Sequence, residues 1–138
     1  MATARKARFG FTKLVVDHEE KLAVYYQEVY GLSPAQRLQG DAGGLGEPFR
    51  EIILGPGGEL SPDESLVLFK FVDRAAPRDQ ESILGFITED LDALVERIQA
   101  NGGSLAGPLR SMPEHGVRVV FSTDPEGHLC ENVELISA

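Results

Sequence analysis

The sequence predicts an α+β fold in which two βαβββ units form a partly closed barrel around a small-molecule cavity. The order of one strand, one amphipathic helix and three further strands occurs twice along the chain, and segments rich in glycine and proline separate the strands. The helix of such a unit covers one face of its sheet and leaves the other bare, so two units can pair around a cavity. We expect residues 1–138 to form a single domain of two modules, at about 9–73 and 81–136.

The first module begins with a half-buried strand and an amphipathic helix. Segment 9–16 is rich in apolar residues with Thr12 and Lys13 interspersed, which is typical of a strand with one buried face. Asp17 offers a helix N-cap, and Glu20 follows three residues later, as in a capping box. The helix is expected to end at Gly31, and its apolar core-facing residues are Leu22, Tyr25, Tyr26, Val29 and Tyr30.

Three strands complete the first module, and the second module repeats the order. The three strands that follow the first helix are predicted at 34–38, 49–54 and 66–72, and the polar segment 73–80 is the expected linker between the modules. The second module contains a strand at 83–88, a helix that carries Leu91, Leu94, Val95 and Ile98 and ends at Asn101-Gly102-Gly103, and strands at 104–109, 117–122 and 129–136.

Composition excludes several classes of protein. The 13 basic and 22 acidic residues give a net charge of −9, which repels nucleic-acid backbones but is compatible with a cationic ligand. No run approaches the roughly 20 apolar residues that span a bilayer. Cys130 is the only cysteine, so an internal disulfide is excluded and a reducing compartment fits. We expect a cytoplasmic protein that binds neither nucleic acid nor membrane.

A tight turn near the C-terminus leads into the first candidate site residue. The turn Asp124-Pro125-Glu126-Gly127 precedes an apolar strand that carries Glu131. An acid in an apolar strand must be solvated, paired or bound to a ligand. Phosphate loops, paired cysteines and nucleophile elbows are absent from the sequence, so Glu131 carries the functional argument.

Four segments resemble the vicinal oxygen chelate superfamily, which includes glyoxalase I, extradiol dioxygenases, and fosfomycin and bleomycin resistance proteins. Segment 23–32 resembles its "aFYrdvLGL" helix, and segment 85–94 resembles its "aF.v.DLdaL" junction. Residues 101–103 resemble its helix-ending glycine pair, and segment 124–131 resembles its "DPdGn.iE" turn. The resemblance covers about 9–135 and implies the two-module fold, a small organic ligand and a homodimer.

The superfamily usually builds a metal site from His and Glu on the first and last strands of each module. Glu131 occupies the last of these four positions. The other three positions fall on Phe11 or Gly10, on Leu68 or Val67, and on Ile83. One carboxylate among apolar side chains cannot hold a divalent cation, because such an ion needs several N, O or S ligands. We therefore predict no metal and no cofactor.

The role of Glu131 has two interpretations. Its carboxylate could bind a ligand cation or act as a general base, or it could simply pair with Arg118 or Lys70. If Phe11 points into the cavity, alternation along the strand places Lys13 there too, where it could pair with Glu131 or help to bind a zwitterion. Lys70 could face either way.

Four other positions have simpler interpretations. His115 lies in a Pro-Glu-His-Gly turn, where it could overhang the cavity mouth or remain exposed. Arg50 and Glu51 are neighbours on one strand, so only one of them can face the cavity. Cys130 points to the opposite face from Glu131, which indicates packing rather than a nucleophile.

The expected function is that of a glyoxalase/bleomycin-resistance-like protein that binds a small organic molecule in a metal-free apolar cavity. Its predicted ligand-binding residues are Phe11, Lys13, Leu68, Lys70, Ile83, His115 and Glu131. The alternative is an enzyme, a lyase, isomerase or epimerase, with Glu131 as general base and Lys13 or Lys70 as its electrostatic partner. A third interpretation is an accessory domain whose cavity is filled by side chains.

Overall fold

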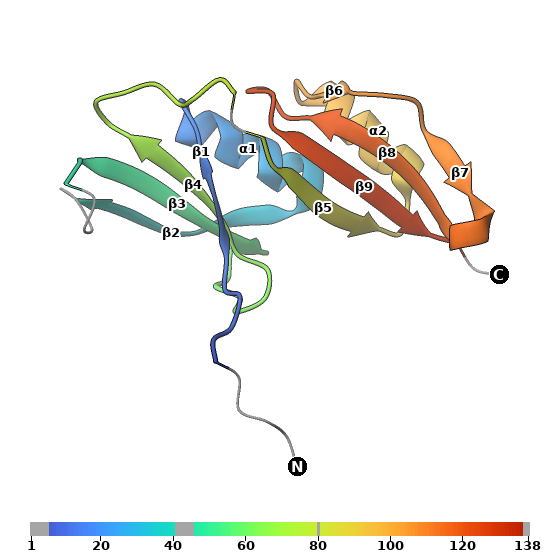
Figure 1. Cartoon of the computed structure of the whole chain (residues 1–138), viewed down its shortest axis with the longest axis horizontal. Coiled ribbons are helices and arrows are strands. Elements are labelled where there is room, and N and C mark those ends of the chain that lie inside the picture. Colours follow the sequence, from blue (N-terminus) through green and yellow to red (C-terminus); the bar gives the residue numbers. More distant parts are fainter. Residues whose placement is uncertain (1–5, 41–45, 80, 137–138) are drawn as a thin grey trace, which may run out of the picture.

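The computed structural model describes residues 6–40, 46–79 and 81–136, which form two β-sheets and two α-helices (Figure 1). The strands of the first sheet, in spatial order, are β1 (Thr12–Val15), β4 (Leu66–Phe71), β3 (Phe49–Pro56) and β2 (Leu32–Gly40). Those of the second are β5 (Ile83–Thr88), β9 (Leu129–Leu135), β8 (Val117–Thr123) and β6 (Ser104–Leu105), and β7 (Arg110–Met112) also pairs with β8. The helices are α1 (Glu19–Tyr30), α2 (Leu91–Ala100) and the short 3₁₀ helix η1 (Pro113–His115).

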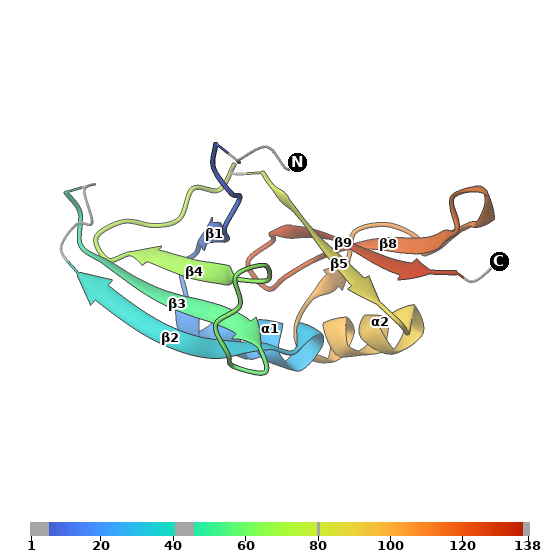
Figure 2. The same cartoon turned by 90° about the horizontal axis from the view of Figure 1, so that it is seen from below.

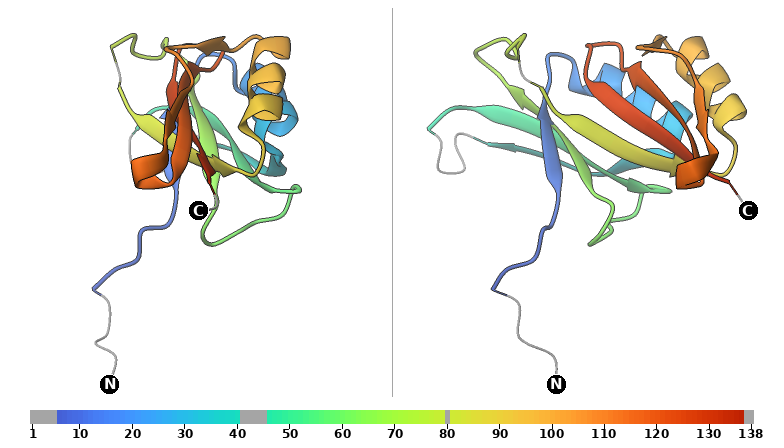
Figure 3. Two further views of the ribbon diagram at one scale, coloured as in Figure 1. Left: turned by 90° about the vertical axis from the view of Figure 1, so that its right-hand side faces the viewer. Right: turned by 45° about the vertical axis from the view of Figure 1, so that its right-hand side comes forward.

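The predicted α+β class and the repeated βαβββ order are confirmed. In each module the first and last strands pair in parallel, as β1 with β4 and β5 with β9, and the remaining pairs are antiparallel. Both helices lie on the same side of the two sheets (Figures 2 and 3). The described strands form two separate sheets, with β1 and β5 as edge strands, and no closed barrel joins them.

Two strand boundaries differ from the sequence prediction for reasons that involve proline. Of the strand predicted at 104–109, the structure has only β6, because Gly107-Pro108 interrupts the ladder and proline has no backbone N–H to donate, and the separate strand β7 begins after the predicted range. β2 is longer than predicted and includes Pro34. Proline is tolerated there because β2 is an edge strand with a shifted register between Pro34 and Gln36.

The first turn of α1 is not the predicted capping box. The N-cap is His18, whose side chain makes no capping hydrogen bond, and the Asp17 carboxylate accepts a hydrogen bond from the Ala76 N–H instead. The carboxylate of Glu126, from the second module, accepts hydrogen bonds of 2.8 Å from the backbone N–H groups of Asp17 and His18. Glu20 pairs with an arginine of β2. A side chain distant in sequence therefore satisfies the donors where the chain enters the helix.

The ends of both helices follow the sequence prediction. Gly31 has a φ of 74° and terminates α1 in the left-handed conformation. After α2, Gly102 has a φ of 90°. A Cβ atom at Gly103 would lie 2.9 Å from Ile98 and from the Thr123 carbonyl oxygen, so this close approach of backbone to strand β8 requires glycine.

One hydrophobic core serves both modules. Helix α1 buries Tyr25 and Tyr26, as predicted, and packs against residues of both sheets. Tyr30 of α1 stacks on Phe86 of β5 with ring centroids 3.7 Å apart, so aromatic packing crosses the boundary between modules. The other buried residues of this core are Leu14, Val16, Leu22, Ala23, Val29, Ile52, Leu54, Leu66, Leu68, Leu91, Leu94, Ile98 and Val120.

The buried carboxylate of Asp124 links the C-terminal turn to the first module. The hydroxyl of Tyr26 on α1 donates to Oδ2 of Asp124 over 2.8 Å, and Nδ1 of His128 lies 2.8 Å from the same oxygen. Oδ1 accepts from the backbone N–H groups of Glu126 and His128. Nε2 of His128 lies 3.3 Å from the Val15 carbonyl oxygen of β1. This network connects a turn of the second module with a helix and a strand of the first.

The Asp124–His128 pair shifts both acid–base equilibria. Burial alone would raise the pKa of Asp124, but the hydrogen bond and charge of His128, with the Tyr26 hydroxyl, hold this pKa below its ordinary value. Burial alone would lower the pKa of His128, but the hydrogen bond and charge of Asp124 raise it above its ordinary value. Folding therefore favours the ionised form of each side chain.

Replacing Asp124 by Asn is expected to lower the free energy of unfolding by about 3 kcal/mol, because His128 and Tyr26 would lose a buried charged acceptor. Urea unfolding followed by circular dichroism measures this change. The matched control is Asp63→Asn, in an exposed ion pair with Arg8. It should change stability by less than about 0.5 kcal/mol. Equal losses in the two variants would contradict the central role of Asp124.

The same pair predicts a pH dependence of stability. The raised pKa of His128 contributes stability that is complete below its unfolded value of 6.5 and is lost as pH rises through the folded pKa. The lowered pKa of Asp124 contributes stability that is present above 3.8 and is lost as pH falls through the folded pKa. Urea unfolding between pH 6 and 9 should show falling stability that His128→Gln flattens. The control His115→Gln, at an exposed histidine, should keep the wild-type slope. An unchanged slope in His128→Gln would refute the linkage.

Candidate functional site

Each sheet has one face that packs against the helices and one face that no helix covers. Alternation along the strands and the strand registers divide the residues between them. Face A denotes the uncovered face of the first sheet, with the adjacent Phe11, and comprises Phe11, Lys13, Phe49, Glu51, Ile53, Val67, Phe69 and Phe71. Face B denotes the uncovered face of the second sheet and comprises Ile83, Gly85, Ile87, Val119, Phe121, Leu129, Glu131 and Val133.

Face A carries an ion pair. The Lys13 ammonium on β1 lies 2.9 Å from Oε1 of Glu51 on β3, and β4 runs between these two strands. The Glu51 side chain is only 7% exposed, whereas that of Lys13 is 38% exposed. The neighbouring Arg50 points the other way and pairs with Glu19 on α1. The structure thus decides which member of the Arg50–Glu51 pair occupies the uncovered face.

Aromatic rings surround this ion pair. Phe49 and Phe69 stack with ring centroids 5.0 Å apart, and Phe71 meets Phe69 edge-on at 4.9 Å. The Lys13 ammonium lies 4.9 Å from the centroid of the Phe69 ring and 5.6 Å from that of Phe11. Both distances are within the range of a cation–π interaction. The Arg74 guanidinium lies 3.6 Å from the Phe71 ring centroid, and Phe69 and Phe71 are nearly buried. Face A therefore combines aromatic rings with two cations, of which Lys13 lies next to the exposed Phe11.

Glu131 lies on face B, between Gly85 and Phe121 in the register of the second sheet. The side chain is partly exposed and has no hydrogen bond or ion pair with any other described residue. The predicted partner Arg118 lies on the helix-covered face, where it binds Asp92 and Glu134 instead. That interpretation of Glu131 is wrong, because adjacent strands of a sheet place Arg118 and Glu131 on opposite faces.

Two predicted ligand-binding residues of β4 lie on the helix-covered face of the first sheet. Leu68 is fully buried in the core, so Val67 is the residue of that pair that occupies face A. The Lys70 ammonium donates to the Arg74 carbonyl oxygen and lies 3.6 Å from Asp17. Lys70 therefore cannot pair with Glu131. Neither Leu68 nor Lys70 lies on face A, and the sequence left these two placements open because period-two alternation gives relative direction but does not say which set of residues faces the helix.

The remaining predicted residues are dispersed. His115 is exposed at the end of η1. Phe11 and Lys13 meet on face A, as expected from alternation, while Ile83 and Glu131 lie on face B. In this chain the two faces belong to separate sheets, so no direct contact joins Lys13 with Glu131. The sequence did not single out Glu51, whose only signal was its position next to Arg50.

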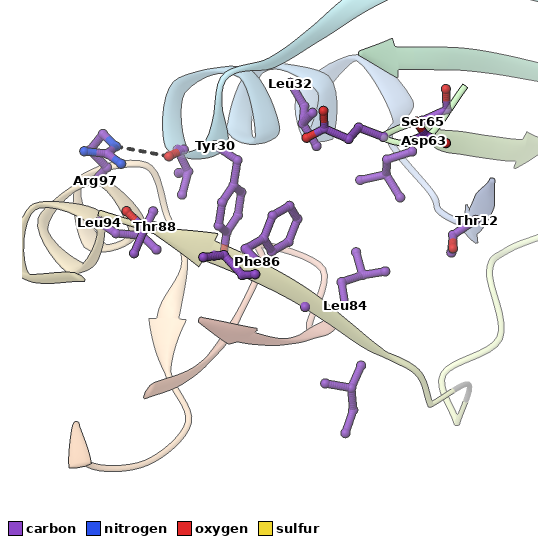
Figure 4. A pocket seen from close by; sticks show the side chains of 16 residues that line it. Thr12, Tyr30, Leu32, Asp63, Ser65, Leu84, Phe86, Thr88, Leu94 and Arg97 are labelled. Carbon is purple, nitrogen blue, oxygen red and sulfur yellow. Dashed lines mark hydrogen bonds between the residues drawn. The ribbon is translucent and has the colours of Figure 1, made fainter. Parts of the chain in front are cut away.

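A groove of about 540 Å³ lies between the modules along the free edge of β5 (Figure 4). Its apolar wall includes Tyr30, Leu84 and Phe86, and Ile83 is the predicted site residue that lines it. The opposite wall includes Thr12 and the segment Asp63–Leu66, which contributes two carboxylates. The groove is open and acidic on one side, in contrast to face A.

The donor set does not fit a divalent metal. Across residues 6–40, 46–79 and 81–136, no three His, Cys, Asp or Glu side chains gather closely enough to hold one. The position in the first module that is equivalent to Glu131 is Val67, because Val67 pairs with Lys13 in the parallel pair β1–β4 as Glu131 pairs with Gly85 in the parallel pair β5–β9. Phe11 lies two residues before Lys13, and Ile83 lies two residues before Gly85, so these two positions are also equivalent. These side chains offer carbon where metal ligands would be needed.

None of the described helices is long and apolar enough to cross a membrane. α1, the longest, has only 12 residues and includes exposed charged side chains.

Comparison with solved structures finds the same fold at low sequence identity. A glyoxalase family protein from Bacillus cereus is 20% identical with a TM-score of 0.80, and the match covers 99% of both chains. The trypanothione-dependent glyoxalase I of Leishmania major is 19% identical with a TM-score of 0.71, covering 94% of this chain and 87% of that one. A fosfomycin resistance protein from Listeria monocytogenes is 17% identical with a TM-score of 0.65, covering 94% of each.

Comparison with curated proteins gives no significant match. One family model matches residues 8–131, which include both modules and the turn that leads to Glu131. Together with the two-sheet fold, this match confirms the resemblance found in the sequence. The chain belongs to the Glyoxalase/Bleomycin resistance protein/Dioxygenase superfamily.

Proposed function

We propose that this protein binds a small organic molecule in an apolar, metal-free cavity formed by faces A and B. The observation that carries the proposal is the chemistry of face A, where aromatic rings surround a lysine–glutamate pair and where the described residues offer no cluster of metal-ligating side chains. Apolar surface that is left open beside a few fixed polar groups is typical of a small-molecule site.

Exposed side chains along the edges of both faces support this proposal. Phe11 is 56% exposed, and Ile83 and Ile87 on β5 are 54% and 74% exposed. Water contact with such large apolar groups costs roughly 25 cal/mol per Å² of apolar surface. Covering them with a ligand or with a second chain recovers this free energy.

The two faces belong to sheets that lie side by side, so a single chain does not close a cavity between them (Figure 1). In a twofold-symmetric homodimer, face A of each subunit would cover face B of the partner and form two equal chambers. Each chamber would combine Lys13 and Glu51 from one chain with a Glu131 side chain from the other. This arrangement extends the proposal to a homodimer with shared sites.

Binding is favoured over catalysis by the surroundings of Glu131. A general base needs a substrate proton within reach and benefits from a neighbouring cation or hydrogen-bond donor. Within the part of the chain that the structure describes, no lysine, arginine or histidine contacts Glu131. The polar groups of face A are also paired with each other rather than directed at a reacting atom.

The purified protein is expected to contain well under one divalent metal ion per chain by elemental mass spectrometry. Its melting temperature should not change in EDTA, whereas members of an aromatic small-molecule library should raise it. A ligand at 100 times its Kd stabilises the folded state by about 2.7 kcal/mol. As a control, the triple variant Phe11→His/Val67→Glu/Ile83→His should gain metal, because it adds three donors at positions that the proposed dimer brings to Glu131. Stoichiometric metal in the wild-type protein would overturn the metal-free proposal.

The dimer predicts a molar mass twice that of one chain in light scattering and analytical ultracentrifugation. Ile87→Lys, on the exposed edge of face B, is expected to shift the protein to the monomer, because it places a charge in the proposed interface. The matched control is Val24→Lys on the outer surface of α1, at a residue that is 60% exposed. A wild-type protein that remains monomeric at all concentrations would refute the shared chamber.

A further inference from the structure

We propose that the Lys13–Glu51 pair on face A binds the oxyanion of an aromatic ligand, a planar ring that carries a carboxylate, sulfonate or phenolate group. The inference rests on the proposed function and deepens it by naming the ligand chemistry and the residue that recognises it. Lys13 is the contact to the anion, the rings beside it hold the aromatic body, and Glu51 fixes the position of the ammonium.

The position of the ion pair is not explained by stability. Arg37–Glu20 is a surface pair with both side chains more than half exposed. Lys13–Glu51 has a nearly buried carboxylate, as Arg50–Glu19 does on the helix side, but its ammonium lies beside the rings of Phe69 and Phe11. Removing charges from water is costly, and an apolar pair of similar volume is often as stable. A lysine at this place is therefore better explained by what it binds.

The ammonium of Lys13 has bonding capacity left for a ligand. It carries three donors, and among the described residues its hydrogen-bond partner is Glu51. Of the two charged groups, the cation is the accessible one and the carboxylate is nearly buried. A ligand that approaches face A thus meets an ammonium first. This order favours an oxyanion over a cation or a zwitterion.

The rings beside Lys13 select a planar ligand. Phe11 is more than half exposed and lies next to the ammonium, while Phe69 flanks the ammonium from within the sheet. An aromatic ring laid on this surface stacks on phenylalanine and at the same time brings its oxyanion to the lysine. A ring without an anion leaves the ammonium with Glu51 as its hydrogen-bond partner, and an anion without a ring leaves the exposed Phe11 in water.

The alternative site, the groove along β5, has the opposite preference. Its wall contains two carboxylates, Asp63 and Glu64, against one cation, Arg97, whose Nε already donates to the Val29 carbonyl oxygen, and the whole chain carries a net charge of −9. Coulomb repulsion therefore disfavours an anion at the groove, and specific binding of an anion requires a local cation such as Lys13. An anionic probe and an uncharged probe of the same ring system can consequently separate the two sites.

The test uses two fluorescent probes, anilinonaphthalene sulfonate and its uncharged parent phenylnaphthylamine, titrated against the folded full-length protein. Lys13→Met is expected to weaken sulfonate binding about tenfold and to leave phenylnaphthylamine binding unchanged. Glu51→Gln should strengthen sulfonate binding, because the amide oxygen still accepts from the ammonium and holds its position while the negative charge that repels the sulfonate is removed. The matched control is Lys21→Met, which removes the same charge from the exposed surface of α1. Circular dichroism and urea unfolding confirm that each variant is folded.

Each outcome decides the inference. If Lys13→Met and Lys21→Met bind the sulfonate as the wild type does, Lys13 does not recognise the anion and the inference is overturned. Binding of phenylnaphthylamine would in that case still support the proposed function. If the wild type binds neither probe, the proposed function and this inference fail together. Should Lys13→Met not fold, Glu51→Gln decides, and an unchanged or weaker affinity for the sulfonate in that variant refutes the proposal.

Discussion

The hydrogen-bonded carboxylate of Asp124 is the interaction on which the arrangement of the two modules depends. It binds the turn that follows β8, the Tyr26 hydroxyl on α1 and the His128 ring, which in turn reaches the backbone of β1. Glu126 of the same turn accepts the two backbone N–H groups at the entry of α1. A buried carboxylate is tolerated only when it is fully hydrogen-bonded, so these partners fix the first module against the second.

The placement of both helices on one side explains why faces A and B are left without a helix. Because α1 is held against both sheets, aromatic and aliphatic side chains of both modules fill one core on the helix side. The opposite sides of the sheets remain without a helix. Faces A and B are therefore a consequence of the same contacts that join the modules, and they contain the exposed Phe11, Ile83 and Ile87.

This chain has the fold of its superfamily, but apolar side chains occupy three of the four strand positions where the resemblance would place metal ligands. Glu131 stays at the place indicated by the Asp-Pro-Glu-Gly turn, but Phe11, Val67 and Ile83 offer no donor atoms. Face A has a lysine that is held by Glu51 and flanked by phenylalanine rings. Such a surface suits recognition of an organic molecule by stacking and one charged hydrogen bond, which needs no inorganic centre.

The sequence by itself determined the class of fold, the order of the elements and the glycine-terminated helices. These features depend on residues close together in the chain, such as the apolar spacing of Leu22 to Tyr30 and the positive φ of Gly31. The same local logic placed Glu131 on a strand after a tight turn. It failed at the start of α1, where the backbone N–H groups of Asp17 and His18 donate to Glu126 and the predicted capping box with Glu20 does not form. Glu126 is more than 100 residues away in the sequence, so no local pattern indicates this contact.

Only the tertiary structure decided which side chains form the candidate site. Alternation along β4 indicated that Val67 and Leu68 point in opposite directions, but the packing of α1 determined that Leu68 lies on the helix-covered face. The partner of Lys13 is Glu51, 38 residues further along the chain and two strands across the sheet. Ion pairs and sheet faces depend on which strands become neighbours, and this information lies in the packing of the whole chain rather than in any local pattern.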